Sequence, residues 1–140
     1  MKLGIMQPYF MPYIGYWQLM NAVDEYVVYD DVNFIKGGWI NRNRILVNGE
    51  PKYINVQMRG ASPFKKINEI EVANDEADIK KKLRMLENSY RKAPYFEMGY
   101  QMMEEIFQSG KTDLASYILY SFERVADYLD IKTKLTVSST

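Results

Sequence analysis

A strand, a helix and a second strand follow one another within the first 30 residues, and this order constrains the fold more than any other feature. Leu3 to Met6 is a short apolar run, which predicts a buried strand, and Tyr26 to Tyr29 is a second one. From about Ile14 the apolar residues between them recur at helical spacing. A unit of this size is typical of two parallel strands joined by a right-handed crossover. The chain therefore predicts an α/β fold.

The helix of this unit should begin after a loop, because Pro8 and Pro12 interrupt any helix across that segment. Its expected buried face carries the apolar residues that recur every three or four positions, with two less regular members. These residues are Ile14, Trp17 and Met20, and less regularly Leu19 and Val23.

A β-hairpin is predicted over residues 44–57. Arg44 to Val47 and Lys52 to Gln57 flank Asn48-Gly49, and this dipeptide is the strongest short hairpin pattern. We expect the hairpin to extend the parallel sheet or to lie at its edge.

Three helices are predicted after the hairpin. Asn74-Asp75 caps the first, Pro94 separates it from the second, Ser109-Gly110 ends the second, and Thr112 or Asp113 caps the third. The inward stripe of the first helix should hold Ile79, Leu83, Leu86 and Tyr90. Its other face, which we interpret as solvated, carries Lys80, Lys81, Lys82, Arg84, Glu87 and Arg91.

Thr133 to Val137 predicts a last strand, and only Ser138-Ser139-Thr140 follow it. In an α/β protein a helix normally follows such a strand and covers the sheet. We therefore expect one domain over residues 1–140, a small Rossmann-like three-layer arrangement in an incomplete or minimal form. Apolar surface on the last strand, at Leu135 or at Thr133 and Val137, would then be covered by another subunit in a homo-oligomer.

Composition excludes several kinds of chemistry. The chain has no histidine and no cysteine, which removes His-based catalysis, thiolate catalysis and His or Cys metal sites. Asp, Glu, Lys and Tyr remain as acids and bases. The formal net charge is zero and no apolar run approaches a membrane span, so we expect neither a nucleic-acid partner nor a membrane span. The absence of cysteine fits a cytoplasmic protein.

Two adjacent carboxylates, Asp30 and Asp31, follow the second strand. Neighbouring residues in an extended chain point to opposite faces, so one of them is the candidate catalytic base, sugar ligand or Mg²⁺ ligand. The equally weighted alternative is that one caps a turn and the other pairs with Arg42 or Arg44. The cofactor stays undetermined, with Mg²⁺ as its candidate.

A basic and aromatic cluster follows within residues 36–44. Arginine matches a phosphate in bidentate fashion, and tryptophan offers a face to a sugar ring or a base. Arg42 and Arg44 should share one face of a strand, and Asn41 and Asn43 the other. The alternative is a hairpin stabilised by ion pairs and a packed tryptophan. The candidate residues are Lys36 for catalysis and Trp39, Asn41, Arg42, Asn43 and Arg44 for ligand binding.

The loop after the first strand completes the candidate site, because ligands of open α/β sheets bind beyond the carboxyl ends of the strands. A phosphate would meet free N–H groups where the helix begins. The candidate ligand-binding residues here are Gln7, Tyr9, Tyr13, Gly15 and Tyr16.

The run from Met6 to Ile45 resembles the WbqC-like family of bacterial proteins. The resemblance lies in QPYF at 7–10, PYIGY at 12–16, NAVD at 21–24, YDDVNFIK at 29–36 and GWINRNRI at 38–45, and it continues more weakly through the helices. It implies a role in surface-polysaccharide biosynthesis, in a family whose members continue beyond the point where this chain stops.

A second, looser resemblance is to nucleotidylyltransferases and pantoate–amine ligases, which carry His-x-Gly-His at the start of the first helix. Here Tyr13-Ile14-Gly15-Tyr16 stands in that place. Tyrosine hydroxyls donate hydrogen bonds to phosphate but cannot carry the positive charge of histidine.

The function expected from these features is a transferase or ligase that binds a nucleotide or nucleotide-sugar and acylates or aminoacylates an amino sugar. The alternative is a non-catalytic module that binds a nucleotide-sugar or a partner protein. A third alternative is a structural or regulatory subunit with a tyrosine-rich interface.

Overall fold

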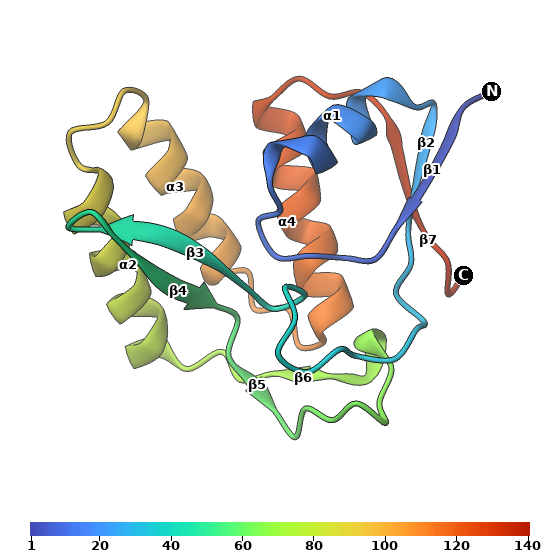
Figure 1. Cartoon of the computed structure of the whole chain (residues 1–140), viewed down its shortest axis with the longest axis horizontal. Helices are drawn as coiled ribbons and strands as arrows, with labels where there is room; N and C mark the ends of the chain where they lie inside the picture. The colour runs from blue at the N-terminus through green and yellow to red at the C-terminus, as the bar shows by residue number, and fades with distance from the viewer.

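A three-stranded parallel sheet joins the two ends of the chain in the computed structural model, which describes residues 1–140. The strands are β1 (Leu3–Met6), β2 (Glu25–Val28) and β7 (Lys134–Val137), in the order β1-β2-β7 (Figure 1). Tyr26 pairs with Gly4 on one side and with Leu135 on the other. The predicted βαβ unit and the parallel arrangement of all three strands are confirmed. The sequence left the strand order open, and the structure places β2 in the centre.

Helix α1 (Ile14–Ala22) connects β1 to β2 and packs with its aromatic face against the core. Trp17 meets Phe122 edge-on, with ring centroids 5.4 Å apart, and Met20 is fully buried. The expectation for Ile14 is wrong, because its side chain is 70% exposed. Ile14 is the first residue of the helix and lies one turn before Trp17, beyond the end of the contact between α1 and the core. Tyr16 is buried instead.

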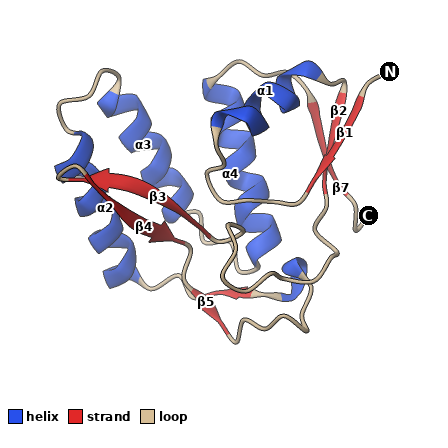
Figure 2. Ribbon diagram, viewed as in Figure 1, coloured by secondary structure: helices blue, strands red, loops and turns tan.

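Only one face of the parallel sheet is covered. Helices α1 and α4 (Leu114–Tyr128) lie against it, while α2 (Glu76–Tyr90) and α3 (Phe96–Phe107) pack elsewhere (Figures 1 and 2). Tyr26 and Val28 point into the covered face and are fully buried, whereas Leu3 and Ile5 are more than half exposed. The parallel sheet and the helices on its one covered face therefore form two layers rather than the expected three. Leu135 and Val137 are half-buried, so the most exposed apolar residues of the sheet belong to β1.

The hairpin is confirmed, but it does not join the parallel sheet. Strands β3 (Arg42–Val47) and β4 (Glu50–Asn55) form a separate two-stranded sheet, and its turn places Asn48 and Gly49 at φ 52° and 79°. The hairpin lies against α2, and Ile45 and Val47 on its inner face are half-buried. A short pair, β5 (Met58–Arg59) with β6 (Glu71–Val72), and the 3₁₀ turn Ile67–Glu69 follow it.

All three predicted helices are present after the hairpin. The Asp75 carboxylate accepts from the Ala77 N–H at the start of α2, and the Asp113 carboxylate accepts from the Ser116 N–H at the start of α4. One cluster of 23 buried apolar residues runs through both parts of the molecule, from Ile54 of the hairpin to Phe122 of α4. None of the helices is long and apolar enough to cross a membrane.

Lys82 departs from the solvated face expected for the lysine run. Its side chain is buried, forms an ion pair with Asp78 one turn earlier, and lies 5.9 Å from the centre of the Phe107 ring. Lys81 and Arg84 are exposed as expected. Lys82 lines a small cavity together with Val56, Val72, Phe107 and Tyr117, so the segments around these residues bury it even though it is charged.

Candidate functional site

One backbone and one side-chain hydrogen bond hold the loop after β1 against the start of the hairpin. The Phe10 N–H donates to the Ile40 carbonyl at 2.9 Å, and the Asn43 amide donates to the Met11 carbonyl at 2.6 Å. The Tyr29 N–H donates to the Met6 carbonyl at 2.8 Å and ties the ends of β1 and β2 together. These three hydrogen bonds connect the end of β1, the loop after it, the residue after β2 and the start of the hairpin.

Two arginines and two aromatic rings meet on the outer face of the hairpin. The Arg42 guanidinium lies 4.5 Å from the Tyr53 ring centre and 5.8 Å from that of Trp39, and the Arg44 guanidinium lies 5.2 Å from Trp39. The two ring centres are 6.2 Å apart. We call Trp39, Arg42, Arg44 and Tyr53 the cation–aromatic surface. Strand alternation places both arginines on this face, and Tyr53 is the cross-strand partner of Arg44.

The positive charges of this surface have no carboxylate partner, because neither arginine takes part in any of the ion pairs of the structure. Arg42 donates from Nε to the Gly38 carbonyl at 3.0 Å and from Nη2 to the Gly37 carbonyl at 2.6 Å. The Arg44 guanidinium donates to no protein group and is exposed, as is Lys36 nearby in the chain. Trp39 is 39% exposed and Tyr53 is 54% exposed, so the rings and the charges face solvent together.

The two asparagines of this segment hold backbone instead. Asn41 is buried and its amide donates to the Val56 carbonyl at 3.4 Å, while Asn43 is committed to Met11. They lie opposite the arginines along β3, as the alternation predicted. In this structure they position the hairpin and the loop, and do not face a ligand.

Asp30 and Asp31 lie where β2 ends, beside the last residues of the chain. Asp30 is 4% exposed and accepts from the Ser138 hydroxyl (3.2 Å), the Ser139 N–H (3.1 Å) and the Ser139 hydroxyl (2.7 Å). Asp31 is half-buried, and its one side-chain donor is the Ser138 hydroxyl, whose single hydrogen it shares with Asp30. Neither carboxylate pairs with Arg42 or Arg44. Asp31 is therefore the carboxylate with free acceptor capacity at this edge of the sheet.

The tyrosines of the loop cluster where α1 begins. The Tyr16 ring lies 5.2 Å from Tyr9 and 5.6 Å from Tyr13, and burial, followed by the neighbouring Tyr9, raises the pKa of the Tyr16 hydroxyl. Tyr13 is 70% exposed and its ring covers Gly15 so closely that an added Cβ there would lie 2.3 Å from it. A phosphate would reach the first N–H groups of α1 only after Tyr13 turned away. Gln7, at the end of β1, is half-buried.

The candidate residues thus form three groups: the cation–aromatic surface, Asp31 with the C-terminal serines, and the tyrosines at the start of α1. The cation–aromatic surface lies on the hairpin, and Asp31 with Ser138 lies at the carboxyl edge of the parallel sheet; no ion pair or side-chain hydrogen bond joins them. Three contributing residues were not predicted: Tyr53, Ser138 and Ser139. The two-residue turn at Asn48-Gly49 fixes the register that sets Tyr53 opposite Arg44, and serines directly after a parallel strand fall at the ligand-binding edge.

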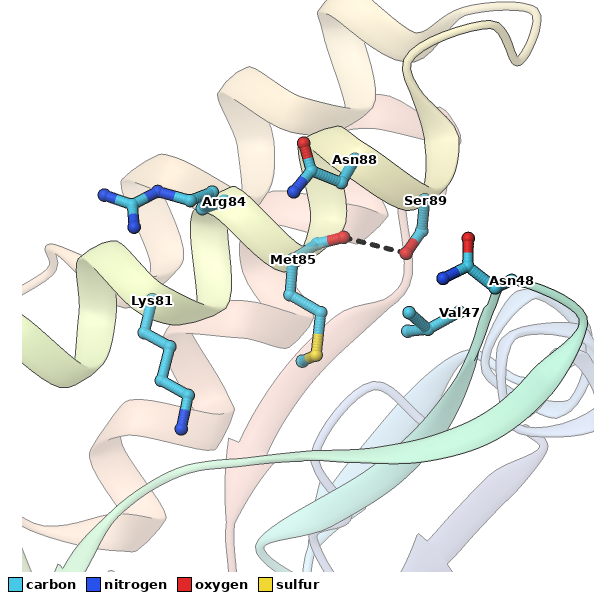
Figure 3. A pocket seen from close by; sticks show the side chains of 7 residues that line it. All are labelled: Val47, Asn48, Lys81, Arg84, Met85, Asn88 and Ser89. Atoms are coloured by element: carbon cyan, nitrogen blue, oxygen red, sulfur yellow. Dashed lines mark hydrogen bonds between the residues drawn. The ribbon is translucent and has the colours of Figure 1, made fainter.

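A hollow of about 270 Å³ between the hairpin tip and α2 gathers further polar residues, but they do not converge. Figure 3 shows Lys81 and Arg84 extending away from Asn48. These side chains therefore do not point toward a common ligand position in the hollow. The Ser89 hydroxyl donates to the Met85 carbonyl at 2.8 Å and is already engaged. We therefore place the site on the cation–aromatic surface.

Comparisons with known proteins give a family and one relative. A model of the WbqC-like protein family matches residues 7–140. An uncharacterized protein of Mycobacterium tuberculosis, Rv1507c, is 31% identical over 140 residues, which cover 98% of this chain and 60% of that protein. The chain thus spans less than two thirds of the length of this relative. No solved structure matches the chain.

Proposed function

The chain belongs to the WbqC-like protein family, and on this basis we propose that it binds a nucleotide-activated sugar as a transferase or ligase of surface-polysaccharide biosynthesis. The observation that carries the proposal is the cation–aromatic surface, where two unneutralised guanidiniums lie beside two exposed rings. Phosphates would bind the arginines, and the sugar or base would stack on Trp39.

Arg44 is the main phosphate ligand in this proposal, since its guanidinium N–H donors are free of protein acceptors and only its backbone N–H donates, to the Asn43 side chain. Arg42 contributes charge but is oriented by the Gly37 and Gly38 carbonyls, which fix its place over Tyr53. Arg42 is therefore held in place before a ligand binds, whereas the Arg44 side chain is free to adjust to the position of the phosphate. Binding of a neutral sugar alone would leave both charges uncompensated, so we favour a phosphorylated ligand.

For the chemical step we assign the base to Asp31. In acyl or aminoacyl transfer to an amino sugar, the amine nitrogen bonds to the activated carbonyl carbon, and the bond from that carbon to the activating group breaks, so that this group leaves with the electron pair. A carboxylate accepts the proton that the amine loses. Asp30 is less suited, because three hydrogen bonds occupy its oxygens. No three acidic side chains form a cluster, so a Mg²⁺ ion would take most of its ligands from phosphate and water.

The alternative is a module that binds a nucleotide-sugar without reacting it. It is favoured by the separation of Asp31 from the cation–aromatic surface and by the commitment of Asp30 to the C-terminal serines. Both proposals place the ligand on the same surface, and turnover distinguishes them.

The test is calorimetric titration and thermal shift with UDP-sugars, dTDP-sugars, CTP and ATP, with and without Mg²⁺. We expect one ligand class to bind, and Arg44→Ala to weaken its binding about tenfold, which corresponds to about 1.4 kcal/mol for a lost charged hydrogen bond. The unfolding free energy of Arg44→Ala should change by less than about 1 kcal/mol, since the side chain is solvated.

Arg59→Ala is the matched control. Arg59 is also an exposed strand arginine, but it pairs with Glu71 at 3.3 Å and lies on β5. Its replacement should leave ligand binding unchanged. Equal weakening by both replacements, or unchanged binding in Arg44→Ala, would exclude the cation–aromatic surface as the ligand site.

A further inference from the structure

We propose a second binding site, for an uncharged apolar group, in a cavity between α2, α3 and the loop after β1. The cavity is open to solvent along Tyr95, which is 77% exposed, has a volume of about 250 Å³, and has no charged residue in its lining. A cavity of about 150 Å³ lined by apolar side chains accommodates benzene, and drug-sized ligands need about 300 Å³ or more. The size therefore fits a bicyclic ring or a short acyl chain.

A glycine within a helix keeps this cavity open. Gly99 lines the cavity from inside α3, and a Cβ added there would meet no atom within 4 Å. Glycine is the least favourable helix residue after proline, and alanine would fit here without a clash. The helix thus keeps a destabilising residue at a position that lines the cavity and has room for a side chain.

Strained backbone borders the same cavity. Five residues other than glycine have positive φ, and three of them are Asn or Asp, which tolerate this conformation. The other two are Met11 (φ 46°) and Tyr95 (φ 61°), and both line this cavity. Strain of this kind at bulky residues concentrates where a ligand is held.

The lining also offers polar contacts for one end of the group. The Tyr90 hydroxyl accepts from the Leu46 N–H at 3.2 Å, and its own hydrogen has no acceptor in the chain. Tyr100 also lines the cavity and has no hydrogen-bond partner there. An apolar group that ends in a neutral acceptor, such as an ester or amide carbonyl, would satisfy these donors. This site lies on the Asn43 side of β3, away from the arginines, and stands independently of the proposed function.

The test uses 1-hexanol and indole as uncharged alkyl and aromatic probes, and hexanoate as the charged counterpart of the first. Binding is followed by thermal shift and by the methyl signals of the methionines. We expect at least one uncharged probe to stabilise the protein saturably and to shift Met11, Met102 and Met103, while fully buried Met20 of α1 stays unchanged. Hexanoate should bind at least tenfold more weakly, because the lining offers its charge no partner.

Gly99→Leu should fill the cavity and abolish binding. Gly99→Ala keeps the fold testable: it should raise the melting temperature of the free protein and weaken probe binding severalfold. The preferred probe distinguishes an acyl from an aromatic ligand. Absence of binding by both uncharged probes, or equal binding to the wild type and to both Gly99 variants, would overturn the proposal without bearing on the arginine site.

Discussion

Tyr26 buries its whole side chain at the centre of the parallel sheet, yet its hydroxyl has no hydrogen-bond partner. An unsatisfied buried hydroxyl costs about 1–3 kcal/mol, and phenylalanine would keep the ring contact with Phe122. We expect Tyr26→Phe to raise the free energy of unfolding at pH 7 by about 1 kcal/mol in urea titrations. Destabilisation by the same amount would mean that the hydroxyl finds a partner in solution.

The same residue predicts a change at alkaline pH. Burial raises the pKa of Tyr26, of Tyr16 and of Tyr117, the last also through Asp78. The unfolded chain releases these protons near pH 10 while the native state keeps them, so the stabilisation is complete below pH 10 and is lost as the pH rises further. Each group contributes a slope of about 1.4 kcal/mol per pH unit. Tyr26→Phe should reduce that slope by one such contribution above pH 10.

The buried Lys82–Asp78 pair predicts an asymmetry between its partners. Asp78→Ala would leave the Lys82 ammonium buried without a counter-ion, and we expect a loss of about 3 kcal/mol. Lys82→Met replaces the charge by an apolar chain of similar length against Phe107 and should cost less than about 1 kcal/mol.

Lys80→Ala is the control for this pair. Lys80 pairs with Glu76 at the same spacing on the same helix but is exposed, so the free energy of unfolding should change by less than about 0.5 kcal/mol. Similar losses in Asp78→Ala and Lys80→Ala would show that the buried pair contributes no more than a surface pair.

At the scale of elements, the apolar stripe of α2 is the part of the packing that the sequence predicted best. Leu83 and Leu86 are buried, and Ile79 and Tyr90 pack at the edge of the core. Leu86→Ala should cost about 2–5 kcal/mol, because a cavity remains beside α3. Leu46→Ala, at a leucine that is 59% exposed on the hairpin, should cost far less. Guanidinium or urea unfolding of both variants measures the difference, and a cost below about 0.5 kcal/mol at Leu86 would place the stripe in solvent.

Local patterns predicted the elements well because local chemistry forms them. Asn48-Gly49 adopts the positive φ angles that the hairpin turn requires, and Asp75 caps α2 as expected. Periodicity failed for Ile14 and Lys82, since it assigns a residue to a side of a helix but does not indicate how far the neighbouring element extends. Whether the hairpin joins the sheet was not accessible either, because edge pairing uses backbone N–H and C=O groups that every strand offers and that leave no sequence pattern.

At the scale of the whole molecule, the two ends of the chain meet at one edge of the sheet. Strand β7 pairs with β2, and Ser138 donates to Asp30 across 108 residues of sequence. Pairing between such distant segments has no local pattern, so the order of the strands and the partners of Asp30 could not be predicted. Parallelism of the strands was predictable, and with it the edge at which Asp31 and the serines lie.

Asp30 and Asp31 are adjacent in the sequence but differ in the hydrogen bonds that they accept. Asp30→Ala removes the acceptor of three hydrogen bonds from Ser138 and Ser139, and we expect a loss of about 1–3 kcal/mol together with faster amide hydrogen exchange in β7. Asp31→Ala removes a single hydrogen bond at a half-buried site and should cost less than about 1 kcal/mol while reducing any turnover. Exchange measured on both variants and on the wild type decides the matter. If Asp31→Ala opens β7 as much as Asp30→Ala does, both carboxylates serve the fold, and the base of the proposed reaction must be sought elsewhere.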